Sequence, residues 1–270
     1  MKAISLGWGV QSFTLAAMSA LGDLEPVDVA IHADTTHETS GTYAFAERWT
    51  PWLEERGVRV VTVRDAAQAA TVTEFKTDIP AFTDTPGGSG GMLRRQCTSR
   101  WKIGPMRKWL RENMVTGSKS VVYEDGEVVV TKQRARHIEQ WLGISLDEFQ
   151  RMKDSDVKYI AHRWPLIEQR MTRWDCQRYL ERHGLEVPPK SACVFCPYHN
   201  MAVWREMKAT GGADWQKAVE VDEAIRKVRP PYDLFLHPAR IPLVDVDLRS
   251  EQDKGQLSLW DAECSGICGV

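Results

Sequence analysis

The sequence contains no uninterrupted apolar stretch of about 20 residues, which is the length that a transmembrane helix requires. We therefore expect no membrane partner. The first residues, MKAISL, follow the pattern of a short buried strand, and a signal peptide is not recognisable in them. These two absences favour a cytoplasmic protein.

A strong net charge is also lacking. The chain has 35 Lys and Arg residues against 37 Asp and Glu residues, a formal net charge of -2. Such a chain has no overall basic field, so any contact with nucleic acid must come from a local patch. Internal repeats and low-complexity tracts are absent too. Tryptophan is abundant, with 11 residues, which favours core packing, with stacking surfaces as the alternative.

The first 65 residues alternate between short apolar runs and amphipathic segments. The runs at 3–6, 27–32 and 58–63 predict strands. The segments at 12–21 and 42–56 predict helices, and each is followed by a glycine. This alternation predicts an α/β fold with a mostly parallel sheet, right-handed crossovers and flanking helices.

The rest of the chain is less regular. Its patterns predict a glycine-rich loop over 76–96, a helix over 101–114, a hairpin around Asp125-Gly126, a strand in IEQWLGIS with a helix after it in LDEFQRMK, and helices over 172–185 and 214–228. The composition changes after VPP, residues 187–189, to cysteine, proline and tryptophan. We therefore expect two parts, an α/β domain over 1–186 and a Cys-rich, partly helical region over 187–270 that packs on it. The tail after Pro230 is expected to be mostly irregular.

The stretch SLGWGVQS, residues 5–12, joins the first predicted strand to the first predicted helix. At the carboxyl end of a parallel strand, glycines let backbone N–H groups approach a phosphate, and the helix N-terminus adds partial positive charge. Ser5, Gly7, Gly9 and Ser12 suit such a loop. A tight turn followed by a helix cap is the alternative, and it is as compatible with these residues alone.

Asp34 and Thr35 follow the second predicted strand, in ADTTHETSGTYAF. A carboxylate at this edge of the sheet is placed to bind ribose hydroxyls or a magnesium ion. The alternative is that the aspartate only ends the strand and caps the next element.

Five segments, taken in order, resemble the PP-loop ATP pyrophosphatases and the phosphoadenosine phosphosulfate (PAPS) reductase superfamily. These segments are SLGWGVQS, ADTTHETSGTYAF, QCTSRWKIGPMRKWL, WLGISLDEFQRM and WPLIE, which together extend from residue 5 to about 168.

The resemblance implies a Rossmann-like sheet of the adenine nucleotide alpha-hydrolase-like type. It also implies that ATP or a related adenine nucleotide is cradled by Ser5, Gly7, Gly9, Gln11 and Ser12. This sequence departs from the pattern in three places. Leu6 and Trp8 flank Gly7 where small residues are usual, and Gln11 stands where many members carry aspartate.

Cysteines form the second group of candidate functional residues. In SACVFCPYHN, Cys193 and Cys196 have the Cys-x-x-Cys spacing that lets two thiolates reach one metal ion. This pair is compatible with zinc, an iron–sulfur cluster or a redox dithiol, and two ordinary buried cysteines are the alternative. The resemblance implies that Cys97 is a third ligand, which suffices for a [4Fe-4S] cluster with one open iron. Cys176 is a candidate fourth ligand, with core packing as its alternative.

Two more cysteines lie in the tail ECSGICGV. The resemblance implies a catalytic role for Cys264, because the assimilatory reductases of the superfamily end in a Glu-Cys tail. The histidine of their tail is missing here. Cys264 and Cys268 are compatible with sulfur delivery, a redox pair or metal binding, and an unstructured end is the alternative.

Together these features lead to the hypothesis of an ATP-using enzyme that transfers sulfur. ATP would adenylate a carbonyl oxygen on an acceptor, pyrophosphate would leave, and sulfur held by the cluster or as a persulfide would displace AMP. Lys102 is expected to contact phosphate, Asp147 to bind magnesium or orient the base, and Mg²⁺ to neutralise the phosphates. Asp147 in the first turn of a helix is the alternative.

The acceptor is expected to be tRNA, DNA or a nucleobase, with a protein as sulfur or electron donor. One alternative function is a sulfonucleotide reductase in which a cysteine attacks the sulfate sulfur. Against it, Thr98 follows Cys97 where cluster-bearing reductases have a second cysteine. Another alternative is a zinc-stabilised nucleic-acid-binding module without catalysis.

Overall fold

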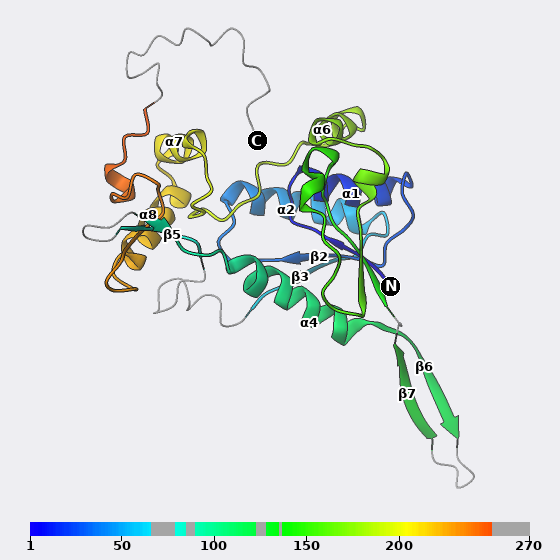
Figure 1. Cartoon of the computed structure of the whole chain (residues 1–270). Coiled ribbons are helices and arrows are strands. Elements are labelled where there is room, and N and C mark those ends of the chain that lie inside the picture. Colours follow the sequence, from blue (N-terminus) through cyan, green and yellow to red (C-terminus); the bar gives the residue numbers. More distant parts are fainter. Residues whose placement is uncertain (66–78, 85–89, 123–127, 135–136, 250–270) are drawn as a thin grey trace. The chain divides into compact units, whose positions relative to one another are not determined.

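The computed structural model of the chain describes residues 1–65, 79–84, 90–122, 128–134 and 137–249 (Figure 1). The chain divides into two compact units, which are described separately. The first unit comprises Met1–Ile79 and Arg95–Val194, and the second comprises Pro80–Arg94 and Phe195–Val270.

The first unit contains a five-stranded sheet. Its strands are β1 (Lys2–Ser5), β2 (Val29–Ala33), β3 (Val60–Val63), β8 (Ile138–Trp141) and β9 (Ile160–Arg163), in the spatial order β3-β2-β1-β8-β9. All four pairings are parallel. The predicted α/β fold with an open, Rossmann-like parallel sheet is therefore confirmed. The order reverses between β1 and β8, the place where open sheets of this kind bind ligands.

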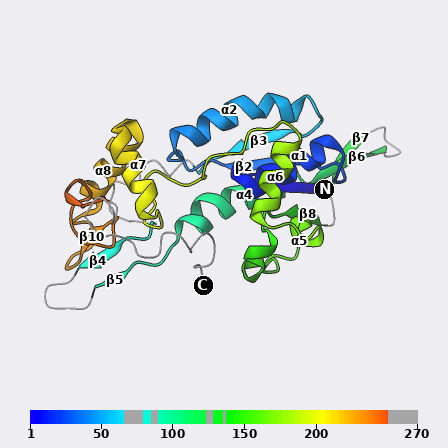
Figure 2. The same ribbon diagram turned by 90° about the horizontal axis from the view of Figure 1, so that it is seen from above.

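Helices cover both faces of this sheet. Helices α1 (Val10–Leu21), α2 (Ser40–Glu54) and α6 (Arg173–Arg182) lie on one face, and α4 (Gly104–Asn113) lies on the other (Figures 1 and 2). The short helix α5 (Pro165–Glu168) follows β9. Two apolar cores correspond to the two faces. One gathers α1, α2 and α6 around Ile4 of β1, and the other packs Leu110 of α4 against Ala3 and Ile31.

Local sequence signals explain where these helices begin and end. Helix α1 ends at Gly22, whose φ of 86° is in the left-handed region that glycine adopts at little cost. Helix α2 begins at Thr39, whose side chain accepts the N–H of Thr42. Helix α6 begins with a reciprocal capping box between Thr172 and Asp175.

The second unit is built on a small antiparallel sheet. Its strands are β4 (Phe82–Asp84), β5 (Gly91–Met92) and β10 (Asp233–Phe235), in the order β10-β4-β5. Helices α7 (Met201–Thr210) and α8 (Ala213–Ile225) complete it. The buried carboxylate of Asp222 in α8 accepts the backbone N–H groups of Leu236 and Leu243, at 2.9 and 3.0 Å.

This division differs from the expected boundary at 186/187 in two respects. The chain passes from one unit to the other after Val194, and residues 80–94 belong to the second unit. The physical reason is strand pairing, because Phe82–Asp84 forms its backbone hydrogen bonds with Asp233–Phe235. The described part of the tail after Pro230 is mostly irregular, as expected, and its short strand β10 supplies this pairing.

Other elements also differ from the sequence-based expectation. LDEFQRMK forms a 3-10 turn, Leu146–Arg151, in which Glu148 leaves the helical region. The helix expected over 101–114 begins with a π-helical turn, Thr98–Ile103, that runs into α4. Helix α7 and strand β9 were not predicted. The hairpin was predicted, and its strands are β6 (Val115–Val122) and β7 (Val128–Arg134).

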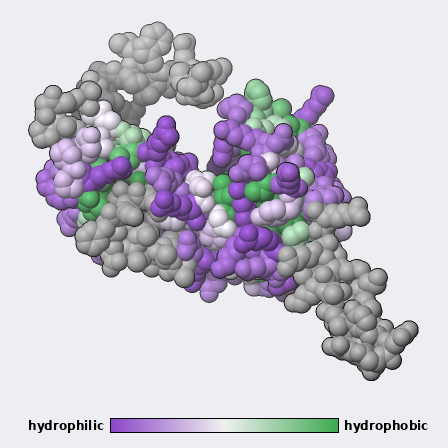
Figure 3. All heavy atoms as spheres, turned by 60° about the horizontal axis from the view of Figure 1, so that its bottom comes forward, coloured by the Kyte–Doolittle hydropathy of each residue, from purple (hydrophilic) through white to green (hydrophobic). Residues whose placement is uncertain are grey.

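The surface is predominantly polar. Figure 3 shows hydrophilic residues over most of the coloured atoms on the face in view. Within the described part of the chain, no helix combines the length and the apolar character that crossing a membrane would require.

Candidate functional site

The loop after β1 is shaped by a buried tryptophan. Trp8 has a φ of 55°, a left-handed conformation that is costly for a bulky residue. Its side chain is 1% exposed and lies against Phe13 and Phe45, with ring centroids 6.2 and 6.3 Å away. The indole is therefore part of the core under α1, and the strained backbone leaves the outer side of the loop to small residues.

Gly7, Gly9 and Ser12 form the outer side of this loop. The Gly7 N–H donates to Ser12 Oγ at 3.1 Å, and that hydroxyl lies 3.2 Å from the Gly9 carbonyl oxygen. Gly9 is the N-cap of α1, so no side chain caps the first N–H groups of the helix. The helix N-terminus thus keeps donors and partial positive charge at the carboxyl end of β1, as an anion site requires.

Gly143, in the loop after β8, packs directly behind this turn. A Cβ atom on Gly143 would lie 2.7 Å from the backbone nitrogen of Ser12 and 2.9 Å from its Cα. Only glycine fits such a close backbone approach. The loops after β1 and β8 therefore touch at the reversal point of the sheet.

Ser5 and Gln11 are both held by internal hydrogen bonds. Ser5 Oγ accepts from Gln140 Nε2 at 2.7 Å. Gln11 is buried, and its amide donates to Glu148 and Ser145 at 3.2 and 3.3 Å. Its carbonyl accepts from Arg173 at 3.0 Å. Gln11 therefore ties the first turn of α1 to the segment that follows β8 and to the first residue of α6.

Asp34 follows β2 and has three donors around its carboxylate. Tyr43 Oη and the Thr36 N–H each donate to Oδ1 at 2.7 Å, and Arg64 Nε donates to Oδ2 at 2.7 Å. Burial alone would raise the pKa of Asp34, but these three bonds outweigh it and hold the pKa below its usual value. Thr36 has a φ of 59°, so the loop after β2 also holds a strained residue. The carboxylate is ionised and orders this loop.

Thr35 leads into a second buried network. Its hydroxyl lies 3.2 Å from Glu38 Oε1 and 3.2 Å from the sulfur of Cys193. The fully buried Glu38 side chain also accepts from Lys102 Nζ at 3.0 Å. Burial lowers the pKa of Lys102, but the charges of Glu38, Cys193 and Cys97 outweigh burial and raise it. Lys102 is therefore a fixed cation beside two thiols.

The segment that carries Cys193 is attached to the edge of the sheet. Its backbone pairs with residues 37–39, through Thr39 N–H to the Ala192 carbonyl at 3.2 Å and Val194 N–H to the His37 carbonyl at 2.8 Å. Ser191 Oγ donates to the Gly7 carbonyl at 2.5 Å. The segment 191–194 thus joins the loop after β1 to the Glu38 network.

The predicted metal ligands are distributed as follows. Cys97 and Cys193 belong to the first unit, and Cys196 belongs to the second. Cys176 is fully buried in the core beside α1, and burial raises the pKa of its thiol to about 12. Cys264 lies outside the described residues. Among the residues that are described, no three His, Cys, Asp or Glu side chains are grouped as a metal site. The cluster therefore stays a prediction.

Asp147 has a structural partner. Its Oδ1 accepts the backbone N–H of Arg173, the first residue of α6, at 2.9 Å. Burial would raise the pKa of Asp147, but bonds from Ser145 and this N–H lower it. Asp147 thus ties the 3-10 turn to the N-terminus of α6, and its role toward magnesium stays a prediction.

Sequence reasoning did not single out three residues of this site. Glu38 forms an ion pair with Lys102, and Arg64 forms an ion pair with Asp34. Gly143 packs against the loop at Ser12. Glu38 stands within the quoted segment ADTTHETSGTYAF, four residues after Asp34, which is a weak signal. Arg64 directly follows the strand predicted over 58–63. A polar residue at that position is expected to lie at the carboxyl edge of the sheet, as Asp34 does.

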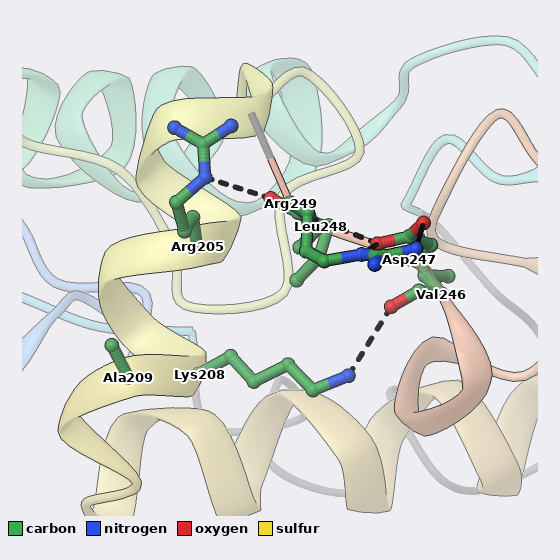
Figure 4. Close-up of a pocket in the computed structure, with 7 residues that line it drawn as sticks. All are labelled: Arg205, Lys208, Ala209, Val246, Asp247, Leu248 and Arg249. Carbon is green, nitrogen blue, oxygen red and sulfur yellow. Dashed lines mark hydrogen bonds and ion pairs between the residues drawn. The ribbon is translucent and has the colours of Figure 1, made fainter. Parts of the chain in front are cut away.

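A surface depression of about 450 Å³ lies elsewhere, in the second unit. It is lined by α7 and residues 246–249, and Figure 4 shows Arg205 and Lys208 bonded to the carbonyl oxygens of Leu248 and Val246, at 2.7 and 3.2 Å. These bonds attach residues 246–249 to α7. None of the predicted site residues lines this depression. Of the predicted site residues that the structure describes, all but Cys196 belong to the first unit.

Comparisons with known proteins give a likeness of structure, with nine matching chains among solved structures. No protein-family model matches the chain, and no curated protein matches it. The chain is similar to the crystal structure of phosphoadenylyl-sulfate (PAPS) reductase from Candida auris in its phosphate complex. The identity is 12%, the TM-score is 0.43, and the match covers 69% of this chain and 74% of that chain.

Proposed function

We propose that the first unit binds an adenine nucleotide, with its phosphates at the loop 6–9 and the N-terminus of α1. The observation that carries the proposal is this loop, where two glycines, Ser12 and an uncapped helix start lie at the reversal point of a parallel sheet. The strained residues Trp8 and Thr36 lie in the loops after β1 and β2, which border the proposed nucleotide site. Strain of this kind is concentrated at functional sites.

We further propose that the protein is an enzyme of the PP-loop type that uses ATP for sulfur transfer. An acceptor carbonyl oxygen would attack the α-phosphate, pyrophosphate would leave, and a sulfur nucleophile would then displace AMP. Lys102 would neutralise phosphate charge, because its ion pair with Glu38 holds its ammonium in place. Magnesium would enter with the triphosphate, since Asp34 already accepts three internal donors.

The thiols beside Lys102 would serve the sulfur chemistry. An iron–sulfur cluster on Cys97, Cys193 and Cys196, or a zinc ion in its place, would supply an open metal position for sulfide or a stable support for the chain. The described residues do not group three such ligands, and the cluster or zinc ion stays part of the proposal.

A sulfonucleotide reductase is the second candidate, and one observation favours it. The Cys193 sulfur lies 3.2 Å from Thr35 Oγ1 at the edge of the nucleotide loop. A thiol so placed suits attack on the sulfur of a sulfonucleotide, which would release the nucleotide phosphate and leave a cysteine thiosulfonate. In this reaction no pyrophosphate is formed.

The test is a pair of variants at Gly7 that are matched in size and differ in charge. A Cβ atom there would have no neighbour closer than Ser12 Oγ at 3.8 Å, so a side chain fits. Gly7→Asp adds a negative charge to the loop, and Gly7→Asn adds the same volume without charge. By calorimetry, we expect ATP binding to be weakened in Gly7→Asn, whose side chain hinders the close approach of a phosphate, and to be weaker still in Gly7→Asp. Equal affinity in the two variants would contradict a phosphate site.

The same preparations separate the candidate functions. Pyrophosphate release from ATP with magnesium supports the sulfur-transfer enzyme, and thiol-dependent sulfite release from a sulfonucleotide supports the reductase. A protein that binds zinc but neither nucleotide would contradict both and support a nucleic-acid-binding module.

A further inference from the structure

Two aromatic side chains of the first unit are unusually exposed. Phe149 is 61% exposed and Trp174 is 59% exposed, which are the highest values among the large hydrophobic side chains of the described residues. Leu146 adds a third exposed apolar side chain. Single exposed apolar residues are common on protein surfaces, whereas a group of them marks an interaction site.

The backbone holds these aromatic residues on adjacent segments. Phe149 belongs to the 3-10 turn Leu146–Arg151, and Trp174 is the second residue of α6. The Leu146 N–H donates to the Met171 carbonyl at 2.8 Å. Asp147 accepts the Arg173 N–H at 2.9 Å. The turn and the start of α6 are therefore fixed side by side.

Arginine is the main charged residue around these rings. The guanidinium of Arg178 lies 4.5 Å from the centroid of the Trp174 ring, in a cation–π contact. Three more exposed arginines belong to the same two segments or border them: Arg151, Arg170 and Arg173. We define the aromatic–arginine surface as Phe149 and Trp174 with these four arginines.

Three carboxylates of the 3-10 turn and of the first turn of α6 accompany the four arginines, and each has internal partners. Asp147 holds the Arg173 N–H. Glu148 is bonded to Gln11 and Arg151, at 3.2 and 2.7 Å. Asp175 closes the capping box of α6. The carboxylates are thus bonded within the fold. Arg151 shares one of these bonds, with Glu148, and all four guanidinium groups belong to exposed side chains.

This surface continues into the candidate nucleotide loop. Arg173 Nη1 donates to Gln11 Oε1 at 3.0 Å, and Gln11 lies in the first turn of α1, next to Ser12. Both views of the molecule show α6 alongside α1 (Figures 1 and 2). A ligand on the aromatic–arginine surface would therefore lie at the same edge of the sheet as the phosphates of the nucleotide.

We propose that the aromatic–arginine surface binds a single-stranded nucleic acid, which presents the base that the enzyme modifies; this inference rests on the proposed function. Exposed rings stack on unpaired bases, and arginine contacts both the bases and the phosphates. The chain has a net charge of -2, so binding depends on this local group. The acceptor is then a base within a strand, and a free nucleobase is excluded as the main substrate.

The test is fluorescence anisotropy with labelled oligonucleotides of mixed sequence, as single-stranded RNA, single-stranded DNA and duplex DNA. The probes should exceed the roughly 4–16 nucleotides that one binding groove covers. We expect single strands to bind more tightly than the duplex, with the RNA and DNA arms identifying the sugar. Trp174→Ala and Phe149→Ala should each weaken binding about 5- to 100-fold, whereas Trp174→Phe should retain most of it.

Arg178→Gln tests the electrostatic contribution. It should reduce the slope of log affinity against log salt concentration by about 0.7, the value for one phosphate contact on a single strand. Arg56→Gln is the matched control, because Arg56 also lies over a tryptophan, at 4.3 Å from the ring of Trp52, but at the C-terminal end of α2. Tyr232→Ala, in the second unit, is the aromatic control. Neither control should change oligonucleotide affinity.

The outcomes separate this inference from the proposed function. ATP binding is measured on the same variants and should stay unchanged in Trp174→Ala and Phe149→Ala. Two results would refute the nucleic-acid-binding role of the aromatic–arginine surface, whether or not ATP binds. One is equal oligonucleotide affinity in these variants and the wild type. The other is no oligonucleotide binding by the wild type at low salt. If the wild type does not bind ATP, the proposed nucleotide site is refuted. The oligonucleotide measurements would still test the aromatic–arginine surface independently.

Discussion

Lys102 Nζ donates to Glu38 Oε1 at 3.0 Å, and the Glu38 side chain is fully buried whereas one third of the Lys102 side chain is exposed. Glu38 follows β2, and Lys102 lies in the π-helical turn after Cys97. This pair therefore connects the loop at the sheet edge to the segment that carries Cys97, a predicted cluster ligand. A π-helical turn inside a helix is frequently found at a functional site.

Removing one partner of this pair should destabilise the protein. Lys102→Met would leave the Glu38 carboxylate buried without its cation, and loss of one partner of a buried pair costs about 3–5 kcal/mol. Because Lys102 is partly exposed, we expect a loss near about 3 kcal/mol in the free energy of unfolding, measured by urea denaturation. The double variant Glu38→Gln/Lys102→Met should be more stable than Lys102→Met alone. A single variant as stable as the wild type would show that the pair contributes nothing.

The sequence predicted the elements around this site better than its long-range contacts. The parallel strands and the loops at Gly7 and Asp34 follow from local periodicity and from the rule that ligands bind at the carboxyl edge of such a sheet. The Glu38–Lys102 pair joins positions 64 residues apart. Periodicity indicates which face of a helix or strand is apolar. It contains no information about which charged residue, distant in the sequence, will contact a given side chain.

The same limit explains the second unit. Strand β4 is three residues long and pairs with β10 about 150 residues later. Three residues give too little alternation to predict a strand, and its glycine-rich neighbourhood predicts a loop. The backbone hydrogen bonds that assign residues 80–94 to this unit arise only when both strands are present.

Gly143 should tolerate no side chain. In Gly143→Ala the new methyl group would lie 2.7 Å from the backbone nitrogen of Ser12, and backbone cannot move aside as a flexible side chain does. Overpacking of this kind costs about 1–3 kcal/mol. We expect this loss of stability together with weaker ATP binding, because the displaced residue is part of the loop. The measurements are thermal unfolding and calorimetry.

Gly41→Ala is the control for this variant. Gly41 lies in the first turn of α2, and a Cβ there would meet only Pro189, at 3.8 Å. Alanine favours a helix by up to about 1 kcal/mol over glycine. Gly41→Ala should therefore be neutral or slightly stabilising. If Gly143→Ala behaved in the same way, the close packing of the loops after β1 and β8 would be refuted.

His32 should make the protein less stable as the pH falls below about 6.5. Its side chain is 5% exposed, and its Nδ1 lies 3.1 Å from the Leu6 carbonyl oxygen. Burial lowers the pKa of His32 in the folded state, although this hydrogen bond and two nearby carboxylates oppose the shift. Because the unfolded chain takes up the proton first, its contribution to stability is complete above the unfolded pKa and is lost as the pH falls through the folded pKa.

The measurement is the free energy of unfolding at pH 7.5 and 5.5 for the wild type and His32→Gln. The interval stays above the titration of ordinary carboxylates, about pH 4. Burial also lowers the pKa of His237, but His237 is present in both proteins. We expect a smaller decrease in His32→Gln than in the wild type. The same decrease in both would assign the pH dependence to other groups.

The cysteines should separate into reactive and protected groups. Cys176 has no exposed surface, and burial raises the pKa of its thiol to about 12, so at neutral pH it is protonated and inaccessible. Cys97, Cys193 and Cys196 are partly exposed. Alkylation of the metal-free native protein, mapped by mass spectrometry, should label these three and leave Cys176 unmodified until denaturant is added. Labelling of Cys176 in the native protein would contradict its position in the core.

Metal analysis of anaerobically purified protein then tests which thiols bind a metal. About four irons with matching sulfide per chain would establish a [4Fe-4S] cluster, and one zinc without sulfide would establish a zinc site. Because Cys176 faces the core beside α1, we expect Cys176→Ala to keep the metal content of the wild type. Cys97→Ser, Cys193→Ser and Cys196→Ser should each lose it. A metal that is lost from Cys176→Ala but kept by Cys97→Ser would require the core around α1 to open, and it would reverse the assignment of the ligands.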